Sequence, residues 1–244
     1  MAPAGIGADL EGLHAVQAAL QAGRLTELRV EGARMSNPEV AVLIEQARTA
    51  GVRIEVVDDI RPFAVTAVPQ GLVGRARPLM TYSLDALTEP APCALVVLDH
   101  LEDPHNVGAI ARSALAAGAT GLVVPTRRAA PIGPTAFKVG AGAFEHLRVS
   151  VQSSTADVVQ RLKRLGVWTV GLTTGGGERL FGLALLTEPV AIVVGGEGQG
   201  LGRLVEERVD VSVRIPMAIG SESLNASVAA ALAVFEVARV RNEL

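Results

Sequence analysis

Three segments of the chain combine glycines with polar residues of types that could bind a ligand or assist a reaction. They are LDHLEDPHNVGAIARSALAAGA (residues 98–119), IVVGGEGQGL (192–201) and IPMAIGSESLNASVAAAL (215–232). Glycine lets a backbone approach a ligand closely, asparagine and serine form hydrogen bonds, and arginine binds anions such as phosphate. The order, spacing and residue types of the segments suggest both a bound cofactor and a reaction.

The glycines of the second segment have a structural and a functional interpretation. No trio of them fits G-x-G-x-x-G, and the block follows a late strand, which disfavours a dinucleotide-binding dehydrogenase. They could form an ordinary flexible turn between a strand and a helix. Alternatively, they bring the backbone close to a ligand at the carboxyl end of a strand, where open α/β sheets bind their ligands. The glycines are Gly195, Gly196, Gly198, Gly200 and Gly202.

Asn106 and Arg112 lie on an expected helix, and each has a structural alternative to a chemical role. The sequence DPHN (residues 103–106) is turn chemistry, so Asn106 could simply cap the helix. Arg112 follows more than one turn later among small and apolar residues, where it needs a partner or a path to solvent. The structural alternative for Arg112 is an ion pair with Glu102, Asp103 or Glu197.

The third segment leads into a long helix rich in alanine. Ser223 or Asn225 could cap that helix. The alanines permit close helix contacts, either inside the domain or at a subunit interface.

Several familiar kinds of site are missing from the sequence. There is no P-loop lysine and no G-x-S-x-G elbow, and Cys93 is the single cysteine, which excludes an intrachain disulfide and a CxxC pair. Four histidines have no partner at metal-ligand spacing, so we expect surface or packing roles for them and no metal site. They are His14, His100, His105 and His146.

The composition is that of a globular protein. Of 244 residues, 49 % are apolar and 19 % are charged, and only 3 % are aromatic, so valine, leucine, isoleucine and alanine must build the core. No apolar run is long enough to span a membrane and the N-terminus does not look like a secretory signal, which together with the lone cysteine favours the cytoplasm. The formal net charge of −3 is unusual for an RNA-binding protein, although a local arginine patch can bind RNA on an acidic chain.

The apolar patterns predict two domains. Over the first part, Asn37 followed by Pro38 is typical of a helix start, and Gly51 of a helix end. Residues 74–92 are polar and punctuated by prolines, which predicts a linker with one short helix near residues 83–87. The expected elements of the first part are a helix over 8–22, a strand from Leu28 to Val30, a helix over 38–50 and a strand over 54–57.

From Cys93 onward, continuous apolar runs alternate with helical patterns. Runs without alternation suit strands that are buried on both faces of a parallel sheet, so we expect a doubly wound α/β domain. Gly118 and Gly166 are placed to end two of its helices. The expected strands are ALVVLD, GLVVP, VWTVGL, AIVVGG and VSVRIP, and the expected helices cover residues 107–117, 155–165, 201–207 and 224–241.

The three segments resemble the motifs of the SpoU family of RNA ribose 2'-O-methyltransferases, over about residues 95–241. EGLHAVQAAL and PQGLVGRARP resemble the small RNA-binding domain of the branch that acts on guanosine in 23S rRNA. The resemblance implies S-adenosylmethionine as cofactor, a homodimer, and a C-terminal domain with a deep trefoil knot. It divides the chain into a substrate RNA-binding domain (1–74), a linker (75–92) and a knotted methyltransferase domain (93–244).

The resemblance also assigns site residues by motif. In the first motif, Asn106 and Arg112 match the catalytic asparagine and arginine. The catalytic residues implied by all three motifs are Asn106, Arg112, Glu197, Ser223 and Asn225. The residues implied to surround the cofactor are Thr173, Gly195, Ile215 and Leu224.

Two positions depart from the usual motifs. Ile219 and then Gly220 follow Met217 where the family more often has glycine first, and Pro69 stands where a histidine often precedes Gln-Gly. The leading alternatives for function are a tRNA 2'-O-methyltransferase, an rRNA methyltransferase that confers antibiotic resistance, and a catalytically idle RNA-binding protein of the same fold. A small-molecule α/β enzyme with a glycine-rich ligand loop is a further alternative.

Overall fold

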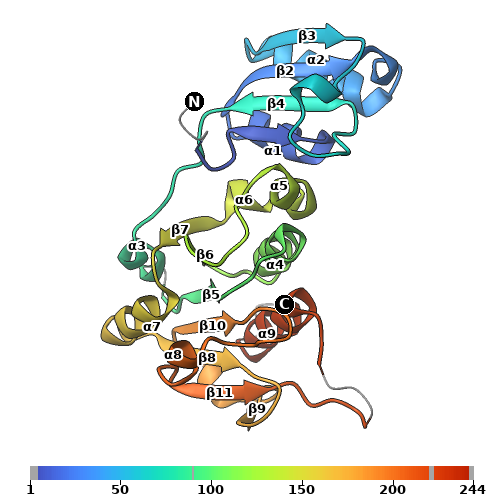
Figure 1. Cartoon of the computed structure of the whole chain (residues 1–244). Helices are drawn as coiled ribbons and strands as arrows, with labels where there is room; N and C mark the ends of the chain where they lie inside the picture. Colours follow the sequence, from blue (N-terminus) through green and yellow to red (C-terminus); the bar gives the residue numbers. More distant parts are fainter. Residues whose placement is uncertain (1–4, 90, 220–222, 242–244) are drawn as a thin grey trace. The chain divides into compact units, whose positions relative to one another are not determined.

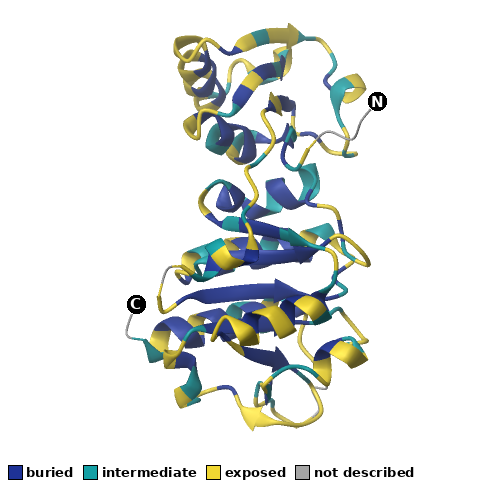
Figure 2. Ribbon diagram, turned by 90° about the vertical axis from the view of Figure 1, so that its left-hand side faces the viewer, coloured by how far each residue is buried: buried dark blue, intermediate teal, exposed yellow. Residues whose placement is uncertain are grey.

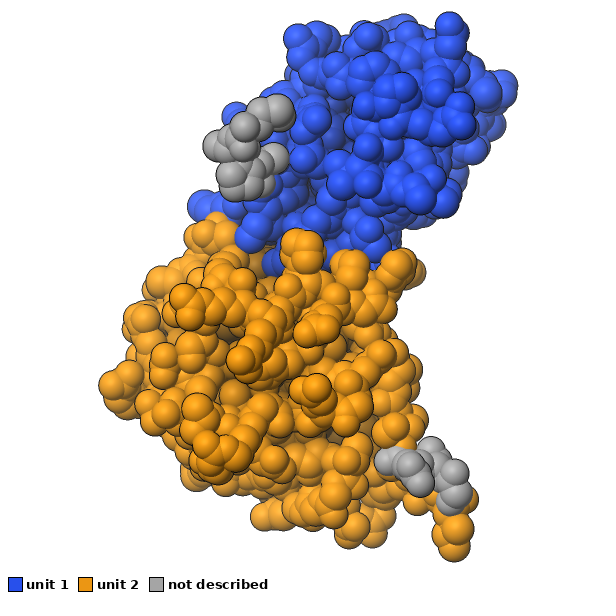
Figure 3. Space-filling model, viewed as in Figure 1, with its two compact units in different colours: residues 1–80, 132–146 blue, residues 81–131, 147–244 orange. Residues whose placement is uncertain are grey.

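The chain forms two compact units. The computed structural model (Figure 1) describes residues 5–89, 91–219 and 223–241. One unit comprises residues 1–80 and 132–146, and the other comprises residues 81–131 and 147–244 (Figure 3). The first unit thus includes six residues beyond the predicted boundary at residue 74, as well as a separate later segment. The domain boundaries at 1–74, 75–92 and 93–244 stay a prediction.

The first unit has a mixed four-stranded sheet with the strand order β1-β4-β2-β3. Its β2 and β3 are parallel, and β4 pairs antiparallel with β1 and β2. The strands are β1 (Asp9–Glu11), β2 (Leu25–Glu31), β3 (Arg53–Val57) and β4 (Leu72–Ala76). The helices are α1 (Leu13–Gln21), α2 (Pro38–Thr49), α5 (Pro134–Gly140) and α6 (Ala143–His146), with short 3-10 turns at Gly32–Arg34 and Arg61–Phe63.

The start of α2 confirms the local sequence signals. The side chain of Asn37 accepts hydrogen bonds from the backbone N–H of Glu39 at 2.9 Å and of Val40 at 3.3 Å, and Pro38 is the first helical residue. Gly51 has a φ of 71°, as expected of a glycine that ends a helix.

Two predictions for this unit are wrong in part. The helix expected over 8–22 begins only at Leu13, because residues 9–11 form the edge strand β1 and Gly12 turns the chain with a φ of 81°. The expected linker contains the end of β4, whose Arg75 pairs with Asp9 of β1. Its short helix is confirmed as α3 (Leu84–Thr88), which Ser83 caps.

The second unit has a wholly parallel sheet, as predicted. Within the described residues it has seven strands in the order β7-β6-β5-β10-β8-β11-β9. The sequence missed two of them, since RVSVQ lacks a continuous apolar run and β9 is very short. The strands are β5 (Ala94–Leu98), β6 (Gly121–Pro125), β7 (Arg148–Gln152), β8 (Trp168–Leu172), β9 (Glu178–Arg179), β10 (Val190–Val194) and β11 (Val211–Arg214).

Helices cover both faces of this sheet, which makes the unit doubly wound (Figure 1). Buried side chains of α3, α7 and α8 pack with alternate residues of β5 and β10, including Leu95, Val97 and Val193. The other face is covered by α4 and α9, which pack on each other. The helices are α4 (Pro104–Ala116), α7 (Thr155–Arg164), α8 (Arg203–Glu206) and α9 (Ala226–Val240), with a 3-10 turn at Ala184–Thr187.

The central strands are buried from end to end, as Figure 2 shows in dark blue. All five residues of β5, β6 and β10 are buried, which explains why these strands appear in the sequence as unbroken apolar runs. Gly118 and Gly166 have φ values of 77° and 76° and follow α4 and α7, as predicted. The rigid sheet holds the loops at its carboxyl edge in place.

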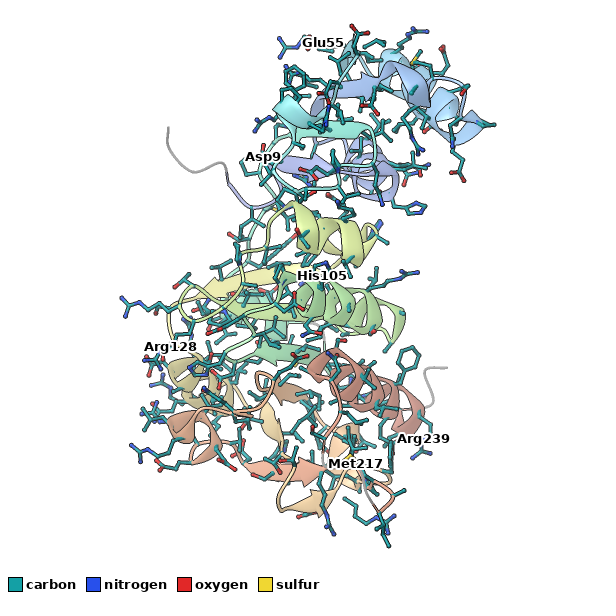
Figure 4. All side chains as sticks on the ribbon, turned by 45° about the vertical axis from the view of Figure 1, so that its right-hand side comes forward. Asp9, Glu55, His105, Arg128, Met217 and Arg239 are labelled. Carbon is teal, nitrogen blue, oxygen red and sulfur yellow. The ribbon has the colours of Figure 1, made fainter. Side chains whose placement is uncertain are left out.

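A buried carboxylate on α9 binds the backbone of the loop at Gly182. The side chain of Glu236 is 4 % exposed, and it accepts hydrogen bonds at 2.7 Å from the backbone N–H of Gly182 and from Arg239. Figure 4 labels Arg239 on α9. The hydrogen bond from Arg239 holds the pKa of Glu236 below its ordinary value of 4.5, against the opposing effect of burial. The ionised form is therefore the one that stabilises the fold.

We expect Glu236→Gln to lower the free energy of unfolding by about 1–2 kcal/mol at pH 7, because charge-assisted hydrogen bonds are lost. A carboxylate with a lowered folded-state pKa stabilises the protein above pH 4.5, and this contribution disappears as the pH falls through the lower folded value. Denaturant unfolding of both proteins at pH 7 and pH 3 should therefore show the difference shrinking in acid. An equal difference at both pH values would contradict this account. Glu206→Gln, at an exposed glutamate, is the control.

Candidate active site

A cavity opens at the carboxyl ends of three neighbouring strands, β8, β10 and β11. We call it the Leu224 cavity; its volume is about 590 Å³. Open parallel sheets bind ligands at this edge. The cavity has an apolar wall that includes Leu172, Val213 and Met217, the last of which Figure 4 labels. Its lining includes all four residues predicted to surround a cofactor, Thr173, Gly195, Ile215 and Leu224, and the predicted catalytic residues Glu197, Ser223 and Asn225.

The glycine block forms the floor of this cavity by close backbone contact. A Cβ on Gly195 would lie 2.2 Å from the carbonyl carbon of Gly200, and a Cβ on Gly196 would lie 2.3 Å from the backbone oxygen of His100. Gly198 and Gly200 have φ values of 78° and 65°, which favour glycine. The block is therefore not an interchangeable flexible turn, because side chains at residues 195 and 196 would push the loop apart.

Three polar side chains from the three sequence segments meet beside the cavity. Asn106 donates from Nδ2 to Oε1 of Glu197 at 3.0 Å, and Asn225 donates from Nδ2 to Oδ1 of Asn106 at 3.1 Å. Asn225 also donates to the same oxygen of Glu197. Residues 106, 197 and 225 are thus brought together from opposite parts of the chain, as the motifs predict. The structure shows no hydrogen bond of Ser223 among the described residues, although Ser223 lines the cavity.

Asn225 also caps α9, which confirms the structural interpretation, while its catalytic role stays a prediction. Its Oδ1 accepts hydrogen bonds from the backbone N–H of Ser227 at 2.8 Å and from the Ser227 hydroxyl at 2.6 Å. Its Nδ2 remains directed to Asn106 and Glu197. The cap fixes the amide orientation that the network needs. Gly220, the shifted glycine of the third segment, lies outside the described residues.

Asn106 is not the cap of its helix. Asp103 caps α4 by accepting from the backbone N–H of His105 at 2.8 Å, and Asn106 lies inside the first turn, 5 % exposed. The hydrogen bond from the His105 backbone N–H lowers the pKa of Asp103 below its ordinary value. The helix therefore has another cap, which leaves Asn106 free to serve the network.

Arg112 lies on the exposed side of α4. It lines neither the Leu224 cavity nor the second cavity that adjoins it. The structural ion pair considered from the sequence is not formed, since Arg112 has no hydrogen bond or ion pair within residues 5–89, 91–219 and 223–241. The guanidinium of Arg112 therefore faces solvent, where it is available to an anionic ligand.

A second cavity of about 780 Å³ adjoins the first, and we call it the His100 cavity. The two share Gly196, Glu197, Gln199 and Gly200 as a common wall. Asn106, Arg128 and Arg203 line the second cavity, and Figure 4 labels Arg128 on the loop after β6. Two ligands could therefore bind on either side of Glu197.

His100, Arg128 and Arg203 are among the cavity residues that the sequence did not predict. Of the four histidines, His14, His105 and His146 are exposed, as expected, but His100 lines a cavity next to the buried Asp99. The only sequence signal was the position of Asp99 and His100 directly after a buried strand. No cluster of three potential metal ligands occurs among the described residues, and none of their helices is long and apolar enough to cross a membrane.

Comparison with known proteins identifies the family. Residues 94–235 match the model of the SpoU rRNA methylase family, and residues 10–82 match that of the RNA 2'-O ribose methyltransferase substrate-binding domain. The chain belongs to the SpoU rRNA methylase family. It is therefore an RNA methyltransferase, and its methyl donor is S-adenosylmethionine. The mixed α/β fold with a small N-terminal sheet and a C-terminal parallel sheet is that of SpoU structures.

Three relatives illustrate the match. The chain is 37 % identical to the 23S rRNA (guanosine-2'-O-)-methyltransferase RlmB of Ralstonia nicotianae, over 96 % of both chains. It is also 37 % identical to the uncharacterized tRNA/rRNA methyltransferase slr0955 of Synechocystis, over 95 % of this chain but only 62 % of that longer protein. The SpoU methyltransferase AviRb from Streptomyces viridochromogenes, solved in complex with AdoMet, superposes with a TM-score of 0.79 at 25 % identity, over 96 % of this chain and 90 % of AviRb.

The Leu224 cavity suits this cofactor. Its apolar wall can hold a nucleobase, and the tightly packed Gly195 to Gly200 loop exposes backbone groups where side chains would block them. Its volume of about 590 Å³ lies within the range of small-molecule sites.

Proposed function

We propose that this enzyme methylates the ribose 2'-hydroxyl of a guanosine in 23S rRNA. The observation that carries the proposal is the meeting of Asn106, Glu197 and Asn225 at the wall shared by two cavities. One cavity suits the cofactor, and the other is large enough for a nucleotide. The likeness to RlmB of Ralstonia nicotianae supports 23S rRNA as the target, and the match of residues 10–82 supports a folded RNA substrate.

The ribose hydroxyl needs positioning and the loss of a proton. When bound, S-adenosylmethionine supplies an activated methyl group on a sulfonium. Arg112 is a poor base, because a guanidinium holds its proton strongly. We assign to it the phosphate next to the target ribose, which it orients while stabilising the developing negative charge on the 2'-oxygen. The phosphate, or a transiently neutral Arg112, takes the proton.

The remaining polar residues orient the substrate in this proposal. Asn106, Ser223 and Asn225 hold the sugar, and Glu197 holds the nucleotide or Arg112. Thr173, Gly195, Ile215 and Leu224 surround the cofactor in the Leu224 cavity. No metal enters the proposal, because the sulfonium is already electrophilic.

The C-terminal domain is proposed to contain a trefoil knot, and the enzyme to work in the cytoplasm, where its rRNA substrate is made. Support for the knot comes from the match of residues 94–235 to the SpoU family.

We also propose a homodimer that forms through α9. Val228, Leu232 and Phe235 recur at helical spacing on α9 and are 46 %, 37 % and 40 % exposed. The opposite side of α9 packs on α4 and the sheet through buried alanines and valines. The exposed stripe is therefore a surface that a second copy could bury.

Phe235→Glu is expected to shift the protein from dimer to monomer, because a carboxylate would be desolvated in the interface. Sedimentation equilibrium at micromolar concentration measures the shift. Val65→Glu replaces an exposed apolar residue of the first unit and should leave the dimer intact. A Phe235→Glu protein that stays dimeric would exclude this face.

The test of the proposed function is methyl transfer from labelled S-adenosylmethionine to unmodified 23S rRNA, 16S rRNA and tRNA in parallel, followed by nucleoside analysis. We expect 2'-O-methylguanosine in 23S rRNA alone. Product in tRNA alone would replace the proposed target, and binding of cofactor and RNA without transfer would indicate an idle RNA-binding protein.

A further inference from the structure

We propose that His100 recognises the base of the target guanosine by accepting a hydrogen bond from its 2-amino group. The inference rests on the proposed guanosine target and adds a specificity-determining residue outside the predicted site. It starts from the His100 cavity, because His100 lines this cavity and does not line the neighbouring Leu224 cavity.

The position of the imidazole is built into the fold. His100 directly follows β5 with a φ of 54°, a conformation that few non-glycine residues adopt. Its ring lies where a side chain on residue 202 would be, since a Cβ on Gly202 would come within 2.8 Å of Cε1 of His100. Its backbone oxygen fills the space that a Cβ on Gly196 would need. Two glycines and an unusual backbone conformation thus place one side chain.

A buried carboxylate lies beside one nitrogen of the ring. Nδ1 of His100 lies 3.0 Å from Oδ2 of Asp99, whose side chain is 3 % exposed and also accepts from the backbone N–H of Gly202 at 2.8 Å. Of the two neutral tautomers of the ring, a carboxylate at this distance favours the one that carries its proton on Nδ1. Nε2 is then an acceptor, and no described residue forms a hydrogen bond with it. The side chain of His100 is 28 % exposed, so a ligand in the cavity can reach it.

The chemistry of the surrounding wall matches guanine. A base that is turned out of its stack presents its Watson–Crick edge to the enzyme, and guanine presents N1–H and the 2-amino group as adjacent donors. Acceptors on this wall are Nε2 of His100 and the carboxylate of Glu197, of which only Oε1 is engaged by asparagines. Arg128 supplies a donor for O6 or N7, the usual arginine contact with guanine.

The experiment removes the amino group from the RNA and the acceptor from the enzyme. The substrate is a 23S rRNA fragment carrying either guanosine or inosine, which lacks the 2-amino group, at the position that the wild type methylates. We measure kcat/KM for both RNAs with the wild type and with His100→Phe, which keeps a ring but has no acceptor. His100→Asn is the second variant, because asparagine tolerates the positive φ but is too short to reach the base. His105→Phe is the matched control, at an exposed histidine of the same segment that lines neither cavity.

We expect the wild type and His105→Phe to prefer guanosine about tenfold, as for one hydrogen bond to a buried polar partner. His100→Phe and His100→Asn should methylate both RNAs at similar rates, with unchanged affinity for S-adenosylmethionine. A wild-type preference that persists in both His100 variants would overturn the inference, and so would a wild type that does not distinguish the two bases. If the wild type methylates no guanosine in 23S rRNA, the proposed target itself fails, and this inference fails with it.

Discussion

Arg112→Ala is expected to lower kcat for methyl transfer by about a hundredfold to a thousandfold, the usual cost of removing one group that stabilises developing negative charge. The affinity for S-adenosylmethionine should stay unchanged, because Arg112 does not line the Leu224 cavity. The protein should also remain folded, since the side chain is exposed and has no hydrogen bond or ion pair among the described residues. Single-turnover methylation of 23S rRNA and calorimetric titration of the cofactor measure the two effects separately.

Arg164→Ala is the matched control for this prediction. Arg164 is an exposed arginine at the end of α7, on the opposite face of the sheet from α4. Its replacement by alanine changes the net charge by the same amount as Arg112→Ala. Its methylation rate should be close to that of the wild type. Equal losses of cofactor binding and methyl transfer in Arg112→Ala would remove the arginine from the proposed chemistry and assign it to the structure of the site.

Gly195→Ala should abolish most cofactor binding, with a dissociation constant raised at least about tenfold and methyl transfer lost in parallel. The new Cβ would lie between 2.2 and 2.5 Å from backbone atoms of Gly200 and Leu201, and backbone cannot rotate away as a side chain can. The loop must therefore shift, which we expect to lower the free energy of unfolding by about 1–3 kcal/mol. Calorimetric titration and thermal unfolding measure both effects.

Gly175→Ala provides the comparison within the same cofactor region. Gly175 follows Thr173 and Thr174 of the Leu224 cavity, and a Cβ there would meet no atom within 4 Å. Its cofactor affinity and stability should match those of the wild type. Wild-type affinity in Gly195→Ala as well would show that the glycine block does not hold the cofactor.

The sequence predicted the parallel sheet well because its signal is local. Strands buried on both faces need apolar side chains at every position, and β5, β6 and β10 are recognisable from this pattern alone. β7, with RVSVQ, has half-buried positions at three of five residues and was missed. β1 and β4 were missed because each is stabilised by pairing with its neighbours in the sheet and has too few apolar residues for its pattern to predict a strand.

Capping shows where local signals stop. The motif with Asn37 and Pro38 predicted the start of α2, since all the atoms involved lie within three residues. Before α4, Asp103 and Asn106 are both suitable caps, and only the backbone geometry selected Asp103. Asn106 is therefore left to form hydrogen bonds with Glu197 and Asn225, which lie 91 and 119 positions later in the chain.

The sequence by itself determined the family, the cofactor and the doubly wound domain, because motif spacing and apolar periodicity are local features of the chain. It also predicted three groups of site residues. Only the tertiary structure decided that Asn106, Glu197 and Asn225 form one network, that Arg112 stands outside both cavities, and that His100 faces a second cavity beside Asp99. The physical reason is distance along the chain. Parallel strands separated by crossover helices bring their carboxyl ends together only when the whole sheet has formed, and no local pattern encodes which side chains then meet.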